Sequence, residues 1–572
     1  MDRTVMRWIM IALGVLLFWK WGLPTFTGSH LKTQDIPVER YVDAPGFIPD
    51  RIDPPAPGQN IGEKAPEGTL CTLQGNRFAA ELSTRGASIT HFYLQEEKYA
   101  QSEARDMSTT PDHERWRSLR TLFRGEEGWD QVAFDRFEWR LAESKSDACV
   151  FAYEDANVNI RKTIQAGSRP YELAVETILT NLSDQRKSHR FSSSIFAFRF
   201  NREIKGHLGR VSPFVTELSC AKTGEVIQKS REDFKEGGWF TQKNSNRYTA
   251  ISNYYFAQAL VPKEEQETPD CQILTEYWTH AGQSIDDDQA GNVYHARLLY
   301  PARSLAPSES ATYRQIAFFG PKDRSVLAQA GGQGGLSDLI NLGFFSPVAK
   351  VLVSVLLFLH GIIPGKSWGI AIILMTLGMR LLLFPLSWKG IQISLRMRRL
   401  KPEMEAIQAR FADNLQAKNL AIMELYRQHG INPLGGCLPQ LVQMPVWFAM
   451  YTTLQTAVEM YRTQFLWFKD LSTPDEYYIL PLVLGGCMII QQCLLPQQGM
   501  DPLQQKMMAY IMPAFFTLMM LFLPAALGIY MLANSLLGIV QQLAVERIVP
   551  RLTTSPKGAI LVKQENSSET SS

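Results

Sequence analysis

The sequence predicts a polytopic α-helical membrane protein with six transmembrane helices and a large all-β sandwich domain on the exported side. Three observations predict this fold class. The chain of 572 residues is too long for one ordinary domain. Its mean hydropathy of −0.12 averages a polar first half with a second half that contains several long uncharged runs. Short strand-like segments, separated by clusters of turn residues, fill the polar half.

The first 27 residues predict a transmembrane anchor with a cytoplasmic N-terminus. Arg3 and Arg7 precede twelve uncharged residues at 8–19, and Lys20 follows them. The run also resembles the core of a cleavable signal peptide, and this alternative stays open. Residues 28–67 are rich in Pro, Gly and Asp and predict a linker.

Residues 68–325 predict an antiparallel β-sandwich without enzymatic activity. Segments such as "YELAVETILTNL" and "RFSSSIFAFRF" have the length and composition of strands. The range contains no nucleophile motif, metal-ligand spacing or glycine-rich phosphate loop, so we expect no catalytic residue and no cofactor. Four cysteines lie in this half, and their pairing stays open among three connectivities: Cys71, Cys149, Cys220 and Cys271.

The second half begins after a glycine-rich hinge at 326–343, and residues 368–546 predict a core of five transmembrane helices. The uncharged runs are 369–386, interrupted only by Arg380, and then 438–458, 477–495 and 507–545. The last run, of 39 residues, is about twice the length of one crossing. Pro524 and Gly528 lie near its middle and predict two helices joined by a tight turn.

The loops between these runs predict the topology. Residues 387–431 carry eight Lys and Arg against four acids, and 459–477 carry two against four. By the positive-inside rule the first loop is cytoplasmic and the second is outside. Only one crossing then separates the sandwich from the basic loop, so residues 344–363 are expected to form an interfacial helix. Both termini are then cytoplasmic, including the tail at 547–572.

The basic loop, 387–431, has helical periodicity with a break at 412–414 and a stop at Gly430. This pattern predicts a cytoplasmic helical hairpin. A connection of this length that keeps a structure is more often functional than a bare linker.

Arg380 is the most informative residue of the core. A charge within an apolar run costs a few kcal/mol on insertion scales, and no Asp, Glu or His lies within a predicted span. Snorkelling to the cytoplasmic surface, roughly 9 Å away, is one interpretation. The other is a hydrophilic pocket walled by polar side chains of the predicted spans. The candidates for its walls are Thr376, Gln440, Gln443, Asn534, Ser535, Gln541 and Gln542.

Five segments carry a family resemblance: "GIAIILMTLGMRLLLFPL", "MELYRQHGINPLGGCLPQLVQMPVWFAMY", "FLWFKDLSTPDEYYILP", "DPLQQKMMAYIMP" and "LGIYMLANSLLGIVQQ". In this order they resemble the YidC/Oxa/Alb family of membrane insertases. Residues from "LSTRGASITHFYL" to "FFGPK" also resemble the periplasmic domain of its Gram-negative members. The resemblance implies a bacterial inner-membrane insertase and chaperone in membrane-protein biogenesis and protein transport, with a periplasmic sandwich.

The resemblance also implies roles for individual residues. Arg380 would lie in a groove that attracts the polar segment of an incoming protein. A slide that receives the hydrophobic helix of the substrate would be formed by Cys437, Pro439, Met444, Pro445, Phe515, Phe516 and Met519. The implied partners are nascent membrane proteins, the Sec translocon, lipids, and ribosomes or signal-recognition targeting factors at the hairpin, without direct nucleic-acid readout. The tail is not strongly basic, which argues against a ribosome contact there.

Two other function classes remain as alternatives. An anion transporter or channel would use Arg380 as its binding site, but an inverted repeat of spans is not apparent. A membrane-anchored carbohydrate-binding or carbohydrate-modifying sandwich would need catalytic residues that 68–325 do not supply.

Overall fold

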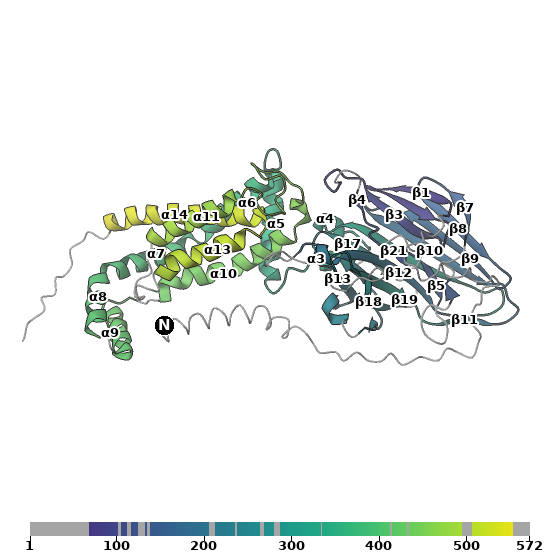
Figure 1. Cartoon of the computed structure of the whole chain (residues 1–572), viewed down its shortest axis with the longest axis horizontal. Coiled ribbons are helices and arrows are strands. Elements are labelled where there is room, and N and C mark those ends of the chain that lie inside the picture. The colour runs from purple at the N-terminus through teal and green to yellow at the C-terminus, as the bar shows by residue number, and fades with distance from the viewer. Residues whose placement is uncertain are drawn as a thin grey trace, which may run out of the picture. The chain divides into compact units, whose positions relative to one another are not determined.

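The computed structural model describes most of the chain between residues 68 and 552 (Figure 1). The described ranges are 68–100, 105–110, 116–123, 132–133, 138–204, 212–234, 237–263, 268–278, 287–332, 335–411, 414–431, 434–494 and 506–552. The predicted anchor, the predicted linker and the tail beyond residue 552 lie outside them. The chain divides into two compact units. The first comprises Met1–Lys350, Ala449–Pro474 and Phe522–Ala526, and the second comprises Val351–Phe448, Asp475–Leu521 and Leu527–Ser572.

The first unit contains the sandwich. Within the described residues, its larger sheet has nine strands in the order β14-β13-β16-β17-β21-β10-β9-β8-β7, and neighbouring strands are antiparallel. Their bounds are β7 Arg140–Ser144, β8 Ala148–Glu154, β9 Val158–Ala166, β10 Glu172–Asn181, β13 Glu217–Lys222, β14 Glu225–Ser230, β16 Tyr248–Ser252, β17 Phe256–Pro262 and β21 Ser310–Pro321.

Two smaller sheets cover the larger one. A six-stranded sheet has the order β15-β18-β19-β12-β5-β6 and packs on β13, β16 and β17. A four-stranded sheet, β1-β2-β3-β4, packs through β1 on β7, β8 and β9. Their bounds are β1 Leu70–Gly75, β2 Phe78–Ser83, β3 Ser88–Leu94, β4 Arg105–Asp106, β5 Thr121–Phe123, β6 Val132–Ala133, β12 Phe191–Phe200, β15 Phe240–Gln242, β18 Asp270–Trp278 and β19 Gly291–Leu299.

Side-chain alternation explains why these segments form a sandwich. Along β9, Val158, Ile160 and Ile164 are fully buried, whereas Arg161 between them is exposed. A period of two places one face of a strand against the facing sheet and the other toward solvent. A small pair, β11 Lys187–His189 and β20 Arg303–Leu305, and a short helix, α3 Asn201–Ile204, complete the domain. The predicted all-β sandwich is confirmed.

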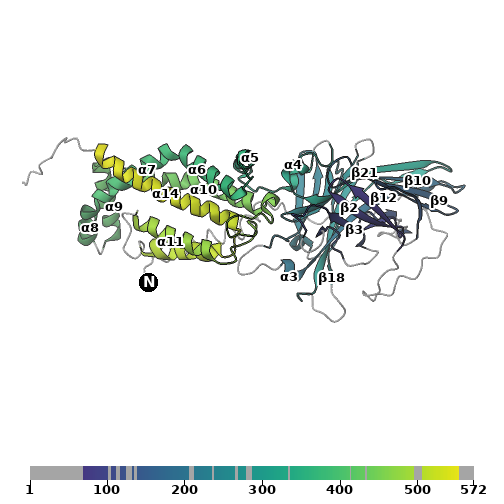
Figure 2. The same ribbon diagram turned by 90° about the horizontal axis from the view of Figure 1, so that it is seen from above.

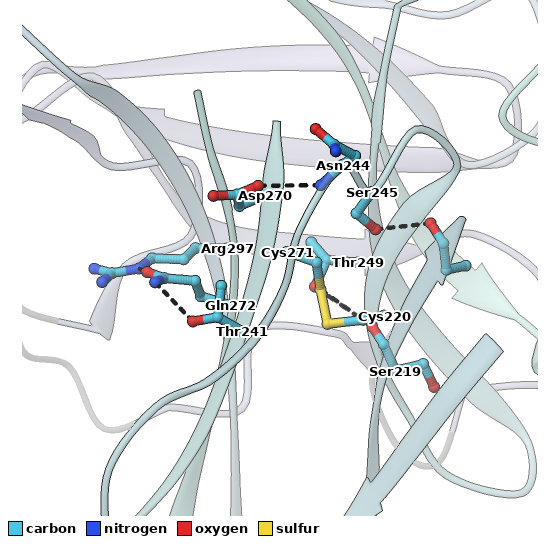
Figure 3. The surroundings of a disulfide bond; sticks show 11 residues. Ser219, Cys220, Thr241, Asn244, Ser245, Thr249, Asp270, Cys271, Gln272 and Arg297 are labelled. Carbon is cyan, nitrogen blue, oxygen red and sulfur yellow. Dashed lines mark hydrogen bonds between the residues drawn. A yellow bond between two sulfur atoms is a disulfide. The ribbon is translucent and has the colours of Figure 1, made fainter. Parts of the chain in front are cut away.

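Two disulfides join the layers. Cys71 of β1 is bonded to Cys149 of β8, and Cys220 of β13 is bonded to Cys271 of β18 (Figure 3). Each bond therefore links the nine-stranded sheet to one of the two sheets that cover it. Disulfides of this kind persist in oxidising compartments, which agrees with an exported domain.

The predicted hinge at 326–343 packs against the sandwich where it is described. Helix α4, Arg324–Leu327, follows β21 directly, and Leu327, Leu336 and Leu339 are buried in the hydrophobic core of the sandwich. Apolar side chains that enter a core hold a connection in place, so this part of the segment is not a free tether.

A segment of the second half also joins the first unit. Helix α10, Leu434–Gln455, is followed by a 3-10 turn at Val458–Met460. Val458 and Tyr461 are buried in the same core as the strands. The ring of Tyr461 contacts those of Tyr255 and Phe256, with centroids 5.2 and 5.7 Å away. The sequence did not predict this packing.

Helices form the second unit (Figures 1 and 2). Besides α10, the elements of the second half of the chain are α5 Ser346–Ile362, α6 Trp368–Leu382, α7 Phe384–Arg399, α8 Lys401–Arg410, α9 Leu415–Gln428, α11 Ile479–Leu494, a π-helical turn Met507–Ile511, α13 Met512–Met520 and α14 Ala525–Leu552. The expected turn near Pro524 is confirmed, because α13 and α14 are separate helices on either side of residues 521–524.

The predicted run 369–386 is not one straight helix. It divides into α6 and α7, which are bent by 64° at Leu383. Pro385 lies in the first turn of α7 and lacks the N–H that a continuous helix needs, so the bend has a local cause. The basic segment then folds back as predicted, because α8 and α9 pack through Met404, Leu425 and Tyr426.

The apolar helices bear on the predicted number of spans. Within the described residues, one helix, Ala525–Ile548, is long and apolar enough to cross a membrane, and the bent pair α6 and α7 would add a second. Shorter apolar helices cover Ser346–Ile362, Ile479–Gln492 and Met507–Met520. The count of six spans stays a prediction, and so does the interfacial position of 344–363.

Candidate functional site

The site is built around Arg380, in the last turn of α6. In the second unit, α14 runs beside α6 and α10 (Figure 2). The segment around Arg380 is helical because it is rich in leucine and methionine, which favour helices, and has no proline before Pro385. Arg380 therefore lies on a regular helix, close to its C-terminal end.

Asn534 of α14 receives the guanidinium of Arg380. The Nε–H of Arg380 donates to Oδ1 of Asn534 at 2.7 Å, and Nη2 donates to the backbone oxygen of Asn534, also at 2.7 Å. Within the part of the chain that the structure describes, Arg380 makes no ion pair with a carboxylate. A neutral amide and a carbonyl thus satisfy two of the donors, and the positive charge is not neutralised.

Gly538 allows this contact. It lies one helical turn after Asn534, and a Cβ at this position would be only 3.0 Å from Nη2 of Arg380. The same Cβ would lie 3.4 Å from Nε2 of Gln491, which belongs to α11. Arg380 of α6 and Gln491 of α11 thus both lie close to the Gly538 position of α14. Gln491 was not among the predicted site residues, although it is one of two polar residues at the end of an uncharged run.

A second polar contact joins α10 to α14. Nε2 of Gln443 donates to the hydroxyl of Tyr530 at 3.2 Å. Tyr530 is buried and lies one turn before Asn534. Sequence reasoning selected Gln443 but missed Tyr530, because a tyrosine in an apolar run is ordinarily a packing residue.

The other predicted groove residues have different surroundings. Thr376 is buried, and its hydroxyl donates to the backbone oxygen of Ile372 in its own helix, at 2.7 Å. Ser535 and Gln541 are half-buried on α14, and Nε2 of Gln541 is buried without an acceptor. Gln542 is buried and donates to Glu546 at 3.5 Å. Gln440 lies in α10, but its side chain is outside the described part.

The predicted slide residues lie on α10 and α13. Met444 and Phe515 are exposed to 47% and 45%, and Pro445, Phe516 and Met519 are half-buried. The side chains of Cys437 and Pro439 lie outside the described part. Large apolar side chains that remain exposed on a helix need an apolar environment to cover them.

Other helices of the second half expose the same kind of surface. Exposed apolar side chains lie on α5, α6, α11 and α14, among them Val351, Phe358, Leu381, Leu382, Leu482, Ile490, Leu536 and Val540. Within the described residues, no group of three or more His, Cys, Asp or Glu side chains is arranged to hold a metal ion.

These features define a class of protein. The helices have exposed apolar surfaces and hold an arginine whose donors bond to a neutral amide, and the sandwich is disulfide-linked. Together these features describe a helical membrane protein with a large exported domain.

Comparisons with known proteins give the family. Residues 70–355 match the model of the YidC periplasmic domain, and residues 358–552 match that of the 60Kd inner membrane protein. A membrane protein insertase YidC from Anaeromyxobacter dehalogenans (strain 2CP-1) is 33% identical over 95% of this chain and 96% of its own length. Another, from Geobacter sp. (strain M21), is 40% identical over 64% of this chain and 68% of its own length. The chain belongs to the YidC family of membrane protein insertases.

Among solved structures, a crystal structure of an active YidC insertase with its first transmembrane domain resolved covers 84% of this chain and 94% of its own. It is 18% identical, with a TM-score of 0.34.

Proposed function

We propose that this chain inserts membrane proteins into the bacterial inner membrane and assists their folding. Arg380 attracts the polar segment that precedes or follows the hydrophobic helix of a substrate. The observation that carries the proposal is the contact with Asn534, which satisfies donors of Arg380 and leaves its charge uncompensated. A charge in that state attracts an acidic segment more strongly than a charge that is already paired.

The groove in this proposal is formed by α6, α10, α11 and α14. Asn534, Gln443 and Tyr530 contribute polar groups from two of these helices, and Gln491 is close to Gly538. Ser535 and Gln541 extend the polar side of α14 toward its C-terminal end. Thr376 contributes less than expected, because the carbonyl of Ile372 already accepts its hydroxyl hydrogen.

The slide in this proposal is formed by α10 and α13. Met444, Phe515, Phe516 and Met519 present methionine and aromatic surface, which adapts to hydrophobic helices of many sequences. The hydrophobic helix of the substrate would leave the groove along this surface and enter lipid. Six spans, with both termini in the cytoplasm and the sandwich in the periplasm, complete the proposal.

The proposed partners are those that the resemblance to the family implies. Nascent membrane proteins are the substrates, and the hairpin of α8 and α9 meets ribosomes or signal-recognition targeting factors. The Sec translocon and membrane lipids are further proposed partners.

Depletion of the chain tests the function. Small inner-membrane proteins should fail to insert in depleted cells, and expression of the intact chain should restore their insertion. Protease accessibility of a tagged substrate from the periplasmic side measures the result. Normal insertion in fully depleted cells would reject the proposal and leave the anion transporter or channel as the alternative.

A further inference from the structure

A small hollow in the sandwich lies between two arginines. Arg105 of β4 and Arg199 of β12 line it, together with Thr109, Ser252, Phe256 and Gln258. Its cavity volume is about 20 Å³. A water-sized group needs about 10–15 Å³ on this measure, so the hollow admits the end of one small polar molecule.

Neither arginine has a carboxylate partner in the described part of the chain. Arg105 donates through Nη1 to the hydroxyl of Tyr461 at 3.4 Å, and its guanidinium lies 4.0 Å from the ring centroid of Phe256. Its Nε is buried without an acceptor. Arg199 faces the ring of Phe214 at 5.7 Å, and its Nε is likewise buried without an acceptor.

The acids nearest to these arginines are otherwise engaged. Asp106 also lines the hollow, but its carboxylate accepts hydrogen bonds from the backbone N–H groups of Phe92 and Ser108 and contacts Nδ1 of His91 at 2.7 Å. Glu203 accepts the backbone N–H of Phe200 at 3.0 Å. Both carboxylates therefore accept hydrogen bonds from groups other than the two guanidiniums.

The electrostatics of the hollow favour an anion. Burial lowers the pKa of Arg199, Glu203 opposes the shift, and the positive charge of Arg105 lowers the pKa further. Burial also lowers the pKa of Arg105. Two desolvated cations that face each other are costly, and an anion between them removes both the repulsion and the unsatisfied donors.

Gln258 indicates what kind of anion fits. Its Nε2 donates to the backbone oxygen of Met107 at 2.8 Å, and its Oε1 is buried without a donor. An oxyanion that carries a hydroxyl matches both the free guanidinium donors and this free acceptor. Monohydrogen phosphate has this combination, whereas sulfate at neutral pH has no hydroxyl.

We propose that the hollow between Arg105 and Arg199 is a binding site for a phosphate group. The oxygens of the phosphate accept from the two guanidiniums, and its hydroxyl donates to Oε1 of Gln258. Because Arg105 also contacts Tyr461, an occupied site would stabilise the packing of the segment that follows α10 against the strands.

Calorimetric titration of the purified full chain in a neutral detergent tests the site. Inorganic phosphate, titrated at constant ionic strength, should bind saturably at one site. Arg199→Gln should weaken this binding at least tenfold, while Arg161→Gln, which changes an exposed arginine of β9, should leave it within twofold. Absence of saturable binding, or equal binding by Arg199→Gln, would overturn the proposal.

Two further measurements test the proposal. Glycerol 3-phosphate is titrated in parallel; its dianion has no hydroxyl on phosphorus to donate to Gln258, so it should bind more weakly than phosphate, and tighter binding would overturn the assigned role of Gln258. Ser252→Asp places a carboxylate in the hollow, so it should abolish phosphate binding and raise the unfolding temperature of the chain. A lower unfolding temperature with phosphate binding retained would overturn the proposal even if Arg199→Gln does not fold.

Discussion

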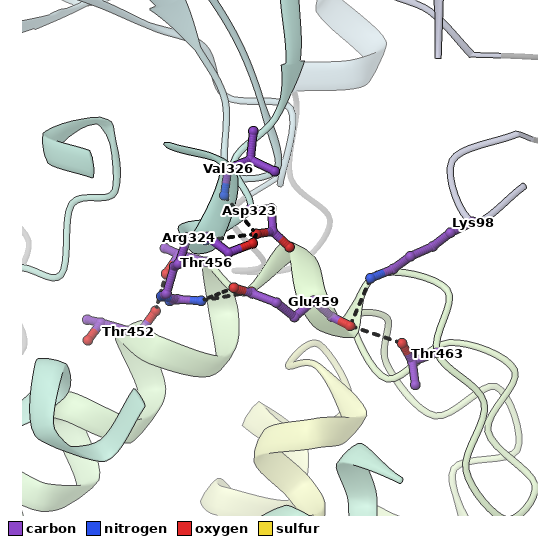
Figure 4. Close-up of polar contacts among 9 residues, drawn as sticks. Lys98, Asp323, Arg324, Val326, Thr452, Thr456, Glu459 and Thr463 are labelled. Atoms are coloured by element: carbon purple, nitrogen blue, oxygen red, sulfur yellow. Dashed lines mark hydrogen bonds and ion pairs between the residues drawn. The ribbon is translucent and has the colours of Figure 1, made fainter. Parts of the chain in front are cut away.

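Nη1 of Arg324 donates to both carboxylate oxygens of Glu459, at 2.8 and 2.7 Å (Figure 4). The two residues are 135 positions apart, and both belong to the first unit. Nζ of Lys98 donates to the backbone oxygen of Glu459 at 3.0 Å, and the hydroxyl of Thr463 donates to the same oxygen at 3.1 Å. Glu459 therefore joins the segment after α10 to α4, which follows the last strand β21, and to the loop that contains Lys98.

Removal of this carboxylate should destabilise the first unit. The side chains of Arg324 and Glu459 are only 15% and 7% exposed, so Glu459→Ala leaves a buried cation without its partner. The expected loss is about 3–5 kcal/mol in the free energy of unfolding. Glu176→Ala breaks a more exposed pair with Arg314 and should cost no more than about 1 kcal/mol. Thermal unfolding in detergent compares the stability of the two variants. Equal losses of stability would contradict the prediction.

The disulfides should carry much of the stability of the sandwich. Cys71 and Cys149 are 78 positions apart, so their bond closes a long loop in the unfolded chain. Replacement of both by serine should lower the free energy of unfolding by about 2–5 kcal/mol. Cys487→Ser, in α11, changes a free cysteine and is the matched control. Urea unfolding followed by tryptophan fluorescence measures both, and an unchanged midpoint in the double serine variant would contradict the prediction.

His189 should make the sandwich sensitive to acid. Burial and, to a smaller extent, the positive charge of Arg303 together lower its pKa to about 3. An unfolded histidine has a pKa near 6.5, so between pH 6.5 and about 3 the unfolded chain binds a proton that the folded chain does not bind. Above pH 6.5 the histidine is neutral in both states and does not reduce the free energy of unfolding. As the pH falls below 6.5, the free energy of unfolding decreases by up to about 1.4 kcal/mol per pH unit.

The variant His189→Gln separates this effect from general acid denaturation. Glutamine does not titrate and keeps a polar group that can reach the hydroxyl of Tyr313, which lies 2.6 Å from Nε2 of His189. Its stability should therefore fall less steeply than that of the unmodified chain between pH 6.5 and 4. His429→Gln, at an exposed position, should follow the unmodified chain. Parallel curves for all three proteins would show that His189 titrates normally.

Gly538 should be required for the position of Arg380. In Gly538→Ala the new Cβ would lie 3.0 Å from Nη2, which forces the guanidinium away from the carbonyl of Asn534. Insertion activity should fall severalfold, although alanine favours a helix by about 1 kcal/mol over glycine. Gly486→Ala in α11 has the same effect on helix propensity, with nothing within 4 Å of the new Cβ, and should keep full activity. Equal activity of the two variants in an insertion assay would contradict the prediction.

Local patterns predicted the sandwich strands and the break near Pro524, but not the bend between α6 and α7. The length and composition of short segments between turn residues predicted the strands, and Pro524 with Gly528 predicted the break between α13 and α14. The charge of Arg380 and the spacing of amides selected Asn534 and Gln443 as possible neighbours, and both make polar contacts in the second unit. The prediction of the break succeeded because it depends on residues close in sequence, whereas the groove role of Asn534 and Gln443 stays a prediction.

Long-range relationships were not predictable in the same way. The spacing of four cysteines allows three pairings, and nothing local distinguishes Cys71–Cys149 from the others. Glu459 lies at the end of an apolar run and has the pattern of a solvated loop residue, so its partner Arg324 could not be inferred. Thr376 shares a helix face with Arg380, but the hydroxyl of a helical threonine often bonds to the carbonyl four residues earlier, as it does here.

The charge of Arg380 should matter more than its hydrogen-bond geometry. If the groove attracts an acidic segment, two unit charges about 4 Å apart attract by on the order of 4 kcal/mol at an effective dielectric constant near 20. Arg380→Lys should therefore keep much of the activity, Arg380→Ala should lose it, and Arg380→Glu should be the most impaired. The loss should be greatest for substrates with acidic translocated tails.

Insertion of one single-span substrate with an acidic, a neutral or a basic tail, measured in each of these backgrounds, separates the two explanations of the arginine. A groove that recognises charge predicts that neutralising the tail reduces the dependence on residue 380. An arginine that only snorkels to lipid phosphate has no means of sensing the tail, since its contacts are the same for every substrate. An equal response to all three tails in folded variants would therefore reject the groove and leave Arg380 as a structural anchor, held by Asn534.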